Sequence, residues 1–401
     1  MEQSPYAVKK SIYEVKLWEG DKPLLSSLNI ELTERCNNKC IHCYINLPKD
    51  DKEAQKKEMT GKEIKKILKE AALLGCMQIM FTGGEPLLRE DFDELYIFTR
   101  KLGIKVFIFT NATLIDEKRA ELFSKIPPGE KIEITIYGMK KRSYEAVTRN
   151  PGSFESAMKG VNLLLQKKVP FVVKGAILPQ NKEEIEEFEE WAKTIPWMDK
   201  PPGYAMFFDL RGRRDKQKDL IKKVRLSPQE GLDIITRKRK EYIKEMKEFC
   251  GKFMKPSGDK IFSCGAGTGG GTVDSYGKFQ LCMLLRHPDT VYDLKKGSLK
   301  DGIENFFVKI REIKATNSDY LNRCGKCFLK GLCEQCPGKS WSEHGSLDTP
   351  VEYLCEIAHK QAEFLGLLEE GEKAWEVVEW KERLDRLTGK EKSDNSTLAV
   401  L

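Results

Sequence analysis

The chain carries the stretch Cys36-Asn37-Asn38-Lys39-Cys40-Ile41-His42-Cys43-Tyr44, in which three cysteines follow the spacing C-x3-C-x2-C. The stretch comes directly after residues 28–33, where apolar and polar residues alternate as they do in a strand. Three thiolates on one short loop can hold three irons of a cubane 4Fe–4S cluster and leave the fourth iron without a protein ligand. The pattern therefore predicts a cluster with a ligand-binding iron at the end of a strand.

A turn of sequence Gly83-Gly84-Glu85-Pro86 follows a second strand-like run at residues 78–82. Together, the cysteine loop and this turn resemble the radical S-adenosylmethionine (radical SAM) superfamily. The resemblance implies that the open iron chelates the amino and carboxylate groups of the methionine moiety, and that the glycine-glycine-glutamate turn meets the amino group. A zinc knuckle is the alternative, but C-x3-C-x2-C lacks the paired C-x2-C units of usual structural zinc sites.

Composition narrows the class of protein. A chain of 401 residues, 40% hydrophobic and 33% charged, is expected to form two or three domains. No apolar run approaches the ~18 residues of a membrane span, and residues 1–5 do not begin a signal peptide. We therefore expect a cytoplasmic protein that contacts no membrane. The net charge of +7 is spread over runs of both signs, which predicts no nucleic-acid partner.

Strand-like and helix-like segments alternate from residue 28 to about residue 214. The expected strands are 28–33, 78–82, 105–109, 131–137, 170–177 and 204–208. Capping boxes at Thr60 and Ser227 mark the starts of two helices, the second a long one reaching residue 249. Apolar strands separated by helices predict an α/β protein with a parallel sheet. The resemblance implies a partial (β/α)6 TIM-like barrel, with its chemistry at the carboxyl ends of the strands.

Twelve cysteines and four histidines favour iron–sulfur ligation over disulfides or His-rich metal sites in a reducing compartment. Seven of the cysteines lie in the last third of the chain and follow a readable spacing: Cys264, Cys282, Cys324, Cys327, Cys333, Cys336 and Cys355. This set resembles the SPASM extension of radical SAM enzymes, with one spacing shortened from x3 to x2. A zinc ribbon would explain only four of the seven.

The SPASM resemblance implies two auxiliary 4Fe–4S clusters besides the one that binds S-adenosylmethionine. Cys324, Cys327, Cys333 and Cys355 would hold one of them, and Cys264, Cys282 and Cys336 the other. Cys250 is a candidate for the missing fourth ligand, and an open iron is the alternative. Cys76 is expected to be a small buried hydrophobe. The expected units are an N-terminal extension at 1–27, the barrel at 28–225, a bridging helix at 226–256, a small Cys-rich α+β SPASM domain at 257–365, and a C-terminal helix and tail at 366–401.

Further cosubstrate contacts follow from the same resemblance. Asn111 and Thr135 stand at later strand ends, and Arg149 resembles the arginine that grips the carboxylate through its planar fork. Leu178 is a candidate for packing on adenine, as is either His42 or Tyr44 beside the last cluster cysteine. For Arg149 a surface role, and for Leu178 core packing, are the alternatives.

The resemblance also implies the reaction. One electron from the reduced cluster cleaves S-adenosylmethionine to a 5′-deoxyadenosyl radical, which removes a hydrogen atom from the substrate. We expect the oxidative modification of a peptide or protein, with flavodoxin or ferredoxin as external electron donor. Met283 follows Cys282 where sulfatase-maturing relatives carry aspartate, which argues against formylglycine formation.

Two other functions remain open. Only 27 residues precede the first strand, too few for a leader-binding domain, so we expect leader recognition to be separate or the substrate to lack a leader. A tetrapyrrole or another small molecule is therefore the alternative substrate. A non-enzymatic iron–sulfur electron carrier is the alternative of another class, and it would need neither the open cluster nor the glycine turn.

Overall fold

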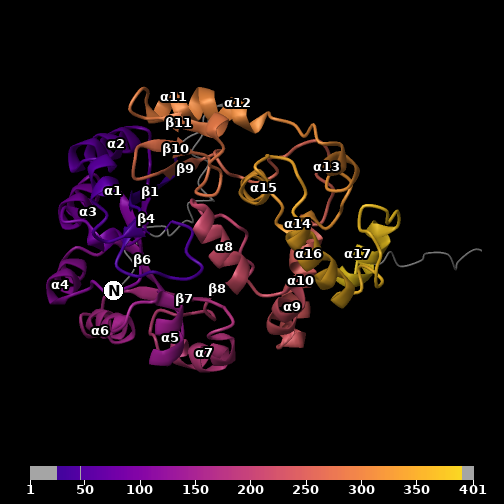
Figure 1. Cartoon of the computed structure of the whole chain (residues 1–401), viewed down its shortest axis with the longest axis horizontal. Coiled ribbons are helices and arrows are strands. Elements are labelled where there is room, and N and C mark those ends of the chain that lie inside the picture. Colours follow the sequence, from indigo (N-terminus) through magenta and orange to yellow (C-terminus); the bar gives the residue numbers. More distant parts are fainter. Residues whose placement is uncertain (1–24, 46, 391–401) are drawn as a thin grey trace, which may run out of the picture.

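The computed structural model describes residues 25–45 and 47–390. Most of the predicted N-terminal extension and the end of the predicted tail lie outside the described residues. Six parallel strands form the centre in the order β1 (Ser27–Thr33), β4 (Gln78–Gly83), β5 (Lys105–Thr110), β6 (Gly129–Ile136), β7 (Phe171–Ala176) and β8 (Tyr204–Ala205). Helices connect successive strands, so this half of the molecule is the expected α/β partial barrel (Figure 1).

The helices of the barrel are α2 (Gly61–Leu73), α3 (Phe92–Lys101), α4 (Glu117–Lys125), α5 (Lys141–Thr148), α6 (Ser153–Gln166), α7 (Ile185–Lys193) and α8 (Asp215–Val224). Helix α2 shows why they pack as they do. The Thr60 hydroxyl accepts the N–H of Glu63, and the Glu63 carboxylate accepts the N–H of Thr60, as the capping box predicts. Ile64 and Leu68 stand four residues apart on one face, and both are fully buried against the sheet.

The cysteine-rich part of the chain extends the same sheet. Strand β9 (Gly270–Val273) pairs in parallel with β1, and β10 (Lys278–Gln280) and β11 (Val291–Asp293) continue the sheet antiparallel. The glycines of β9 permit this packing, because a Cβ at Gly271 would lie 2.7 Å from the carbonyl oxygen of Gln280. The segment that the sequence predicted as the SPASM domain begins with these three strands, which extend the barrel sheet beyond β1.

The bridging segment is two helices, α9 (Pro228–Thr236) and α10 (Arg239–Phe253), where the sequence predicted one long helix. The chain breaks at Arg237 and Lys238. Both cations reach the carboxylate of Glu189 on α7, whose side chain is only 7% exposed. These two ion pairs with the nearly buried Glu189 favour a break between α9 and α10 over a continuous helix.

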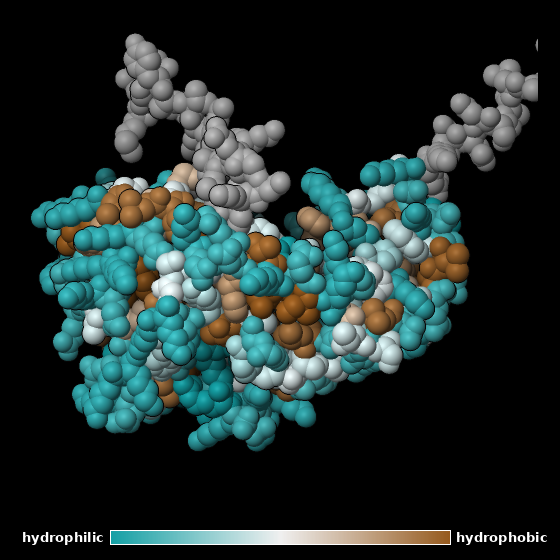
Figure 2. All heavy atoms as spheres, turned by 90° about the horizontal axis from the view of Figure 1, so that it is seen from above, coloured by the Kyte–Doolittle hydropathy of each residue, from teal (hydrophilic) through white to brown (hydrophobic). Residues whose placement is uncertain are grey.

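The remaining short elements are β2 (Arg35–Cys36), β3 (Leu47–Pro48), α1 (Lys52–Lys57), α11 (Leu299–Asp301), η4 (Gly302–Phe307), α12 (Val308–Arg311), α13 (Ser318–Asn322), α14 (Lys330–Cys333), α15 (Pro337–His344) and the 3-10 turns η1 (Pro86–Leu88), η2 (Lys182–Glu184) and η3 (Pro288–Thr290). Two longer helices, α16 (Glu352–Phe364) and α17 (Trp380–Thr388), end the described chain. Figure 1 shows α13–α17 on the side away from α3 and α4, with α8 between the two halves. On the face seen in Figure 2, hydrophobic residues are interspersed among hydrophilic ones.

Candidate active site

The cysteine loop and the glycine turn lie together at the carboxyl ends of β1 and β4. The N–H of Gly84 donates to the carbonyl of Thr33 at 2.7 Å, and the N–H of Glu85 donates to the carbonyl of Arg35 at 3.0 Å. A Cβ at Gly84 would lie 2.6 Å from the carbonyl carbon of Arg35, and Gly83 has φ of +130°. Only glycine allows this close approach and this backbone conformation. The two glycines therefore dock the turn along the strand that leads into the cysteine loop.

The Glu85 carboxylate is fully buried, and it does not line the cavity that the next paragraph describes. It accepts hydrogen bonds from the N–H of Asn111 and the hydroxyl of Thr110, both at 2.8 Å, and from the N–H of Leu87 at 3.1 Å. Burial raises its pKa to about 7. Glu85 thus ties the turn to the end of β5, and its side chain does not line the cavity.

A cavity of about 450 Å³ opens at the carboxyl ends of the strands. All three loop cysteines line it, together with five residues that the sequence predicted to bind the cosubstrate, namely Tyr44, Gly83, Gly84, Asn111 and Thr135. These residues come from four separate segments of the chain. The partial barrel therefore brings them together at the edge where the sequence predicted the chemistry.

Besides Glu85, two predicted contacts do not line this cavity. Leu178 is fully buried in an apolar cluster with Ile41 and Phe208, the core packing that the sequence left as its alternative. Arg149 is exposed and caps the end of α5 in the left-handed conformation, with φ of 48°. The carbonyl of Thr148 accepts the N–H of Lys39 at 2.8 Å, so the end of α5 supports the cysteine loop through its backbone. The sequence assigned Arg149 from its spacing after Thr135. That spacing does not show that α5 ends at Thr148, one residue before Arg149.

Sequence reasoning missed most of the outer wall of the cavity. This wall is aromatic and charged, and consists of Phe109, Tyr137, Lys174, Tyr204, Met206, Phe207, Phe208, Asp209 and Arg211. The sequence predicted a strand at 204–208, but β8 ends at Ala205 and residues 206–209 line the cavity without continuing the strand. The available signal was position, since these residues lie within or shortly after strands β5 to β8 of the barrel.

His42 is the most unusual group in the wall. Its ring lies 5.4 Å from that of Tyr137 and 5.2 Å from that of Phe208, measured between centroids. Burial, helped by the nearby Arg211 cation, lowers its pKa to about 4, so the ring is neutral at neutral pH. Its Nδ1 atom is buried without a hydrogen-bond partner among the described residues. A neutral ring nitrogen on a cavity wall suits a bound ligand with a complementary polar edge.

The three loop thiols fit a metal cluster chemically. Burial raises the pKa of Cys36 and of Cys40, so thiolates there require a positive partner. Polar groups already face the sulfurs: the N–H of Asn38 lies 3.4 Å and the Asn111 amide nitrogen 3.7 Å from the Cys36 sulfur. The Tyr137 side chain bonds to Cys40. Such donors are the usual surroundings of iron–sulfur ligands.

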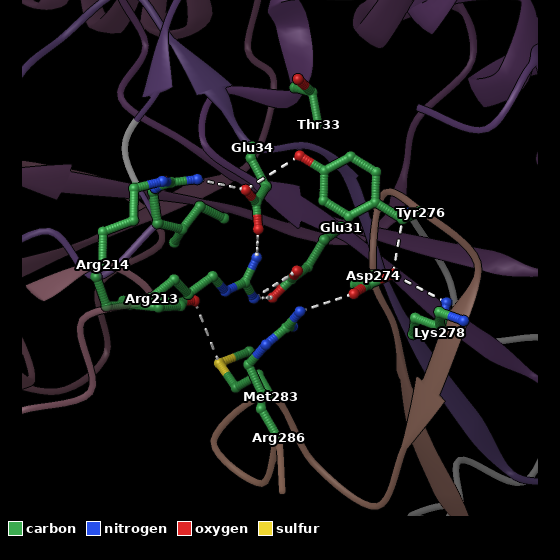
Figure 3. Close-up of polar contacts among 12 residues, drawn as sticks. Glu31, Thr33, Glu34, Arg213, Arg214, Asp274, Tyr276, Lys278, Met283 and Arg286 are labelled. Atoms are coloured by element: carbon green, nitrogen blue, oxygen red, sulfur yellow. Dashed lines mark hydrogen bonds and ion pairs between the residues drawn. The ribbon is translucent and has the colours of Figure 1, made fainter. Parts of the chain in front are cut away.

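A buried ion network links the barrel to the β9–β10 hairpin (Figure 3). The guanidinium of Arg213 pairs with both oxygens of Glu31 at 2.7 Å and with Glu34, and all three side chains are at most 6% exposed. Arg214 pairs with Glu34 at 2.7 Å, and the hydroxyl of Tyr276 donates to Glu34 at 3.1 Å. Charges buried this deeply are tolerated because they are paired. The network joins the strand before the cysteine loop to the segment after β8 and to the hairpin.

The same network positions Tyr44. Its ring lies beside the Arg213 guanidinium at 5.6 Å, and its hydroxyl lies 3.7 Å from the Met283 sulfur. Met283 directly follows Cys282 and lines the cavity. One wall of the cavity thus belongs to the cysteine-rich part of the chain.

A second, narrow cavity lies beside α14 and α16 and is lined by Cys324, Cys327, Cys333 and Cys355. These are the four cysteines that the resemblance assigned to one auxiliary cluster. Burial raises the pKa of Cys324 to about 11 and that of Cys327 to about 12. Four partly buried thiols around one small cavity form a donor set that fits a cubane cluster.

The third group is Cys264, Cys282 and Cys336. Burial raises the pKa of Cys282, and the neighbouring Cys336 and Cys264 raise it further, which places the three thiols within electrostatic reach of one another. Cys250 does not join them. It is fully buried on α10 in an apolar cluster with Phe328, and burial alone raises its pKa to about 11. Cys76 is also buried and lies in the main core as expected.

Two further findings concern metal ions and membranes. Within residues 25–45 and 47–390, no three His, Cys, Asp or Glu side chains are placed to hold a single metal ion. A tetrahedral zinc would require its sulfurs about 2.3 Å from one point. No helix in the described ranges is both long and apolar enough to cross a membrane.

Residues 30–193, which include the cysteine loop, the glycine turn and β1–β7, match the family described as the Radical SAM superfamily. The chain contains a radical SAM domain. Its sequence is 24% identical over 334 residues to the AdoMet-dependent heme synthase of Methanosarcina barkeri, covering 79% of this chain and 92% of that protein. It is 31% identical over 178 residues to the GTP 3′,8-cyclase of Clostridium botulinum, a match that spans 43% of this chain and only 54% of that protein.

Two solved structures show that the radical SAM fold continues through the SPASM-like part. The structure titled native anSMEcpe with bound AdoMet aligns with a TM-score of 0.61 at 15% identity, covering 91% of this chain and 100% of that one. The S-adenosylmethionine-bound SuiB of Streptococcus suis aligns with a TM-score of 0.59 at 18% identity, covering 83% and 75%. A further anSMEcpe structure, with a TM-score of 0.58, holds a bound Cp18Cys peptide.

Proposed function

We propose that this radical SAM enzyme oxidises a substrate held between its radical-forming end and an electron-accepting end. One observation carries the proposal: a single cavity is lined both by Cys36, Cys40 and Cys43 and by Met283 and Glu334. Met283 adjoins Cys282, and Glu334 stands between Cys333 and Cys336. Burial raises the pKa of Cys336, and Asp209 in the same cavity wall raises it slightly further, so the third cysteine group lies near the cavity.

The cysteine loop would hold a 4Fe–4S cluster, and the adjoining wall would bind S-adenosylmethionine. When bound, these groups supply a 5′-deoxyadenosyl radical that removes a hydrogen atom from the substrate. The N–H groups of Gly84 and Glu85 are used within the protein, so the turn offers carbonyl oxygens, which suit an ammonium group. Asn111 and Thr135 add polar contacts, and the neutral His42 ring adds an aromatic surface with an unpaired nitrogen.

The two distal cysteine groups would hold auxiliary clusters that take up the second electron as the substrate radical is oxidised. Cys324, Cys327, Cys333 and Cys355 would complete one cluster. Cys264, Cys282 and Cys336 would leave one iron of the other without a cysteine, because Cys250 lies elsewhere. Each cleavage of S-adenosylmethionine also needs one electron from outside, and we propose flavodoxin or ferredoxin as its donor.

The size of the cavity favours a peptide or protein substrate. About 450 Å³ lies toward the lower end of the range that encloses one drug-sized ligand, and S-adenosylmethionine is itself such a ligand. The space left suits a single side chain that projects from a chain held outside. The bound peptide of anSMEcpe, a protein of the same fold, is consistent with this arrangement.

A tetrapyrrole is the second candidate substrate. It is favoured by the relative that matches over 92% of its own length, which is a heme synthase. A shorter match, 29% identical over 154 residues, is to the Fe-coproporphyrin III synthase of Methanosarcina barkeri. The aromatic wall of the cavity, including Tyr204, Phe207 and Phe208, suits a flat apolar ring.

Anaerobic reconstitution tests the chemistry. The reduced protein is expected to cleave S-adenosylmethionine to 5′-deoxyadenosine and methionine and to hold about twelve irons in three cubane clusters. Replacing Cys36, Cys40 and Cys43 with Ala should remove about four irons and abolish cleavage. Zinc as the dominant metal in protein purified without oxygen would contradict the proposal, and so would cleavage that survives the triple substitution.

Deuterium transfer separates the two substrates. The enzyme is incubated with extract of cells grown in heavy water, and deuterium in 5′-deoxyadenosine is measured by mass spectrometry. A peptide substrate predicts that protease treatment of the extract abolishes the label, whereas a tetrapyrrole predicts that it survives. Direct addition of Fe-coproporphyrin III provides the matched positive test for the second candidate.

A further inference from the structure

The sulfur of Cys355 is approached by two side chains from the wall of its cavity. The Nδ1 atom of His359 lies 3.6 Å from this sulfur and 2.8 Å from the carbonyl oxygen of Cys355. The Nη2 atom of Arg323 lies 3.9 Å from the same sulfur. By contrast, Cys327 and Cys333 are met by the main-chain N–H groups of Leu329 and Gln335. Cys355 is therefore a ligand position whose hydrogen bonding depends on side-chain identity.

The tautomer of His359 follows from its other ring nitrogen. The N–H of Ala374 donates to Nε2 at 3.2 Å, so Nε2 carries the lone pair. In the neutral ring the proton then resides on Nδ1. The Nδ1–H is thus directed at the oxygen and the sulfur of Cys355 as a shared donor. The edge of the His359 ring packs on Trp375 with centroids 5.5 Å apart and planes at 70°, which fixes its orientation.

Arg323 is held in place just as firmly. Two hydrogen bonds to Glu352, at 2.7 and 2.9 Å, fix its guanidinium, which also lies 4.8 Å from the ring centre of Trp375. Its Nε atom is buried without a hydrogen-bond partner among the described residues, and the residue lines the cavity. Arg323 thus places a fixed positive charge and an unused Nε–H donor beside the four thiols. Such a group suits an anionic occupant of the cavity.

We propose that His359 and Arg323 are positioning residues that raise the reduction potential of the cluster held by Cys324, Cys327, Cys333 and Cys355. Reduction adds negative charge to a cluster, and hydrogen bonds or a cation at a ligand sulfur stabilise the more negative state. A higher potential makes this cluster a better acceptor for the electron removed from the substrate. The inference rests on the proposed function only in requiring that a cluster occupies this cavity.

Redox titration of the reconstituted full chain, followed by electron paramagnetic resonance, tests the inference. The signal of this cluster is the one lost in Cys327→Ala. His359→Phe keeps a ring against Trp375 and removes the donor. We expect at least a tenfold change in the reduced-to-oxidised ratio at fixed potential, a midpoint about 59 mV more negative for one electron. Arg323→Gln should shift the midpoint in the same direction, and Arg323→Lys, which keeps the charge, should shift it less.

The matched control is Arg142→Gln, the same substitution as Arg323→Gln at an exposed residue of α5. It should leave every midpoint unchanged. A measurement on the unsubstituted protein covers the case in which a variant fails to fold: in protein labelled with 15N only at histidine, electron–nuclear double resonance should show a histidine nitrogen coupled to this cluster, because the main-chain donors to Cys327 and Cys333 carry no label. Unchanged midpoints in both His359→Phe and Arg323→Gln at full iron content would overturn the inference and leave the proposed function standing, as would the absence of that coupling. A wild-type chain without a cluster in this cavity would overturn both.

Discussion

Replacing Gly84 with Ala is the sharpest test of how the glycine turn is built. The new Cβ would lie 2.6 Å from the Arg35 carbonyl carbon and 2.8 Å from the Glu34 carbonyl oxygen, both of them rigid backbone atoms. The turn must therefore move away from the cysteine loop and weaken the hydrogen bonds from Gly84 to Thr33 and from Glu85 to Arg35.

The expected loss follows from these contacts. Forcing a methyl group into packed backbone costs about 1–3 kcal/mol, and each weakened hydrogen bond costs about 1 kcal/mol. Together these predict that the free energy of unfolding falls by about 3–5 kcal/mol. Because both glycines line the cavity, binding of S-adenosylmethionine should weaken in parallel.

Urea unfolding followed by circular dichroism, with S-adenosylmethionine binding measured by calorimetry, checks this prediction. Gly203→Ala is the control, since a Cβ there meets nothing within 4 Å and its φ is not positive. It should be neutral in both assays. If Gly84→Ala matched the control in stability and in binding, the tight docking of the turn would not be a requirement of the site, and our account of the two glycines would be wrong.

Three further predictions follow from the other contacts. Arg213→Met leaves Glu31 buried without its cation, while Glu34 keeps Arg214, and should cost about 3–5 kcal/mol in urea unfolding. Arg214→Met, at a side chain 37% exposed, should cost clearly less; equal losses would contradict the network. Arg149→Ala should leave the affinity for S-adenosylmethionine unchanged because its side chain lies outside the cavity, while Asn111→Ala should weaken it, and calorimetry showing the reverse order would restore the sequence-based assignment. Cys250→Ala should retain the iron content of the reconstituted wild type, whereas Cys327→Ala should lose about four irons; iron loss in Cys250→Ala would return Cys250 to the ligand set.

Local sequence signals predicted the elements of this fold because their causes are local. The capping boxes at Thr60 and Ser227 form as expected, since they depend only on residues three apart. The four cysteines that the SPASM resemblance groups together line one cavity. The break between α9 and α10 could not be read in this way, because it depends on Glu189, nearly fifty residues earlier in the chain.

The sequence predicted which residues at the ends of strands reach the candidate site. It did not predict whether a given side chain points into the cavity or away from it. Asn111 and Thr135 line the cavity as predicted, but Glu85 turns to the end of β5 and Leu178 turns into the core. A spacing argument identifies the segment that reaches the site and not the face that a side chain presents. The ligand roles of the cysteines remain predictions that metal analysis will test.

The pairing of β1 with β9 can form only late in the synthesis of the chain. Ser26 and Gly269, which hydrogen-bond at the start of this pairing, are 243 residues apart in sequence. At about 5–20 residues per second, a ribosome needs roughly 12–50 s to make the strand that covers the edge of β1. For that time the nascent barrel presents an uncovered strand edge, the surface through which chains aggregate. Expression at lower translation rates, or with abundant chaperones, should therefore affect the yield of this protein more than the stability of its finished fold would suggest.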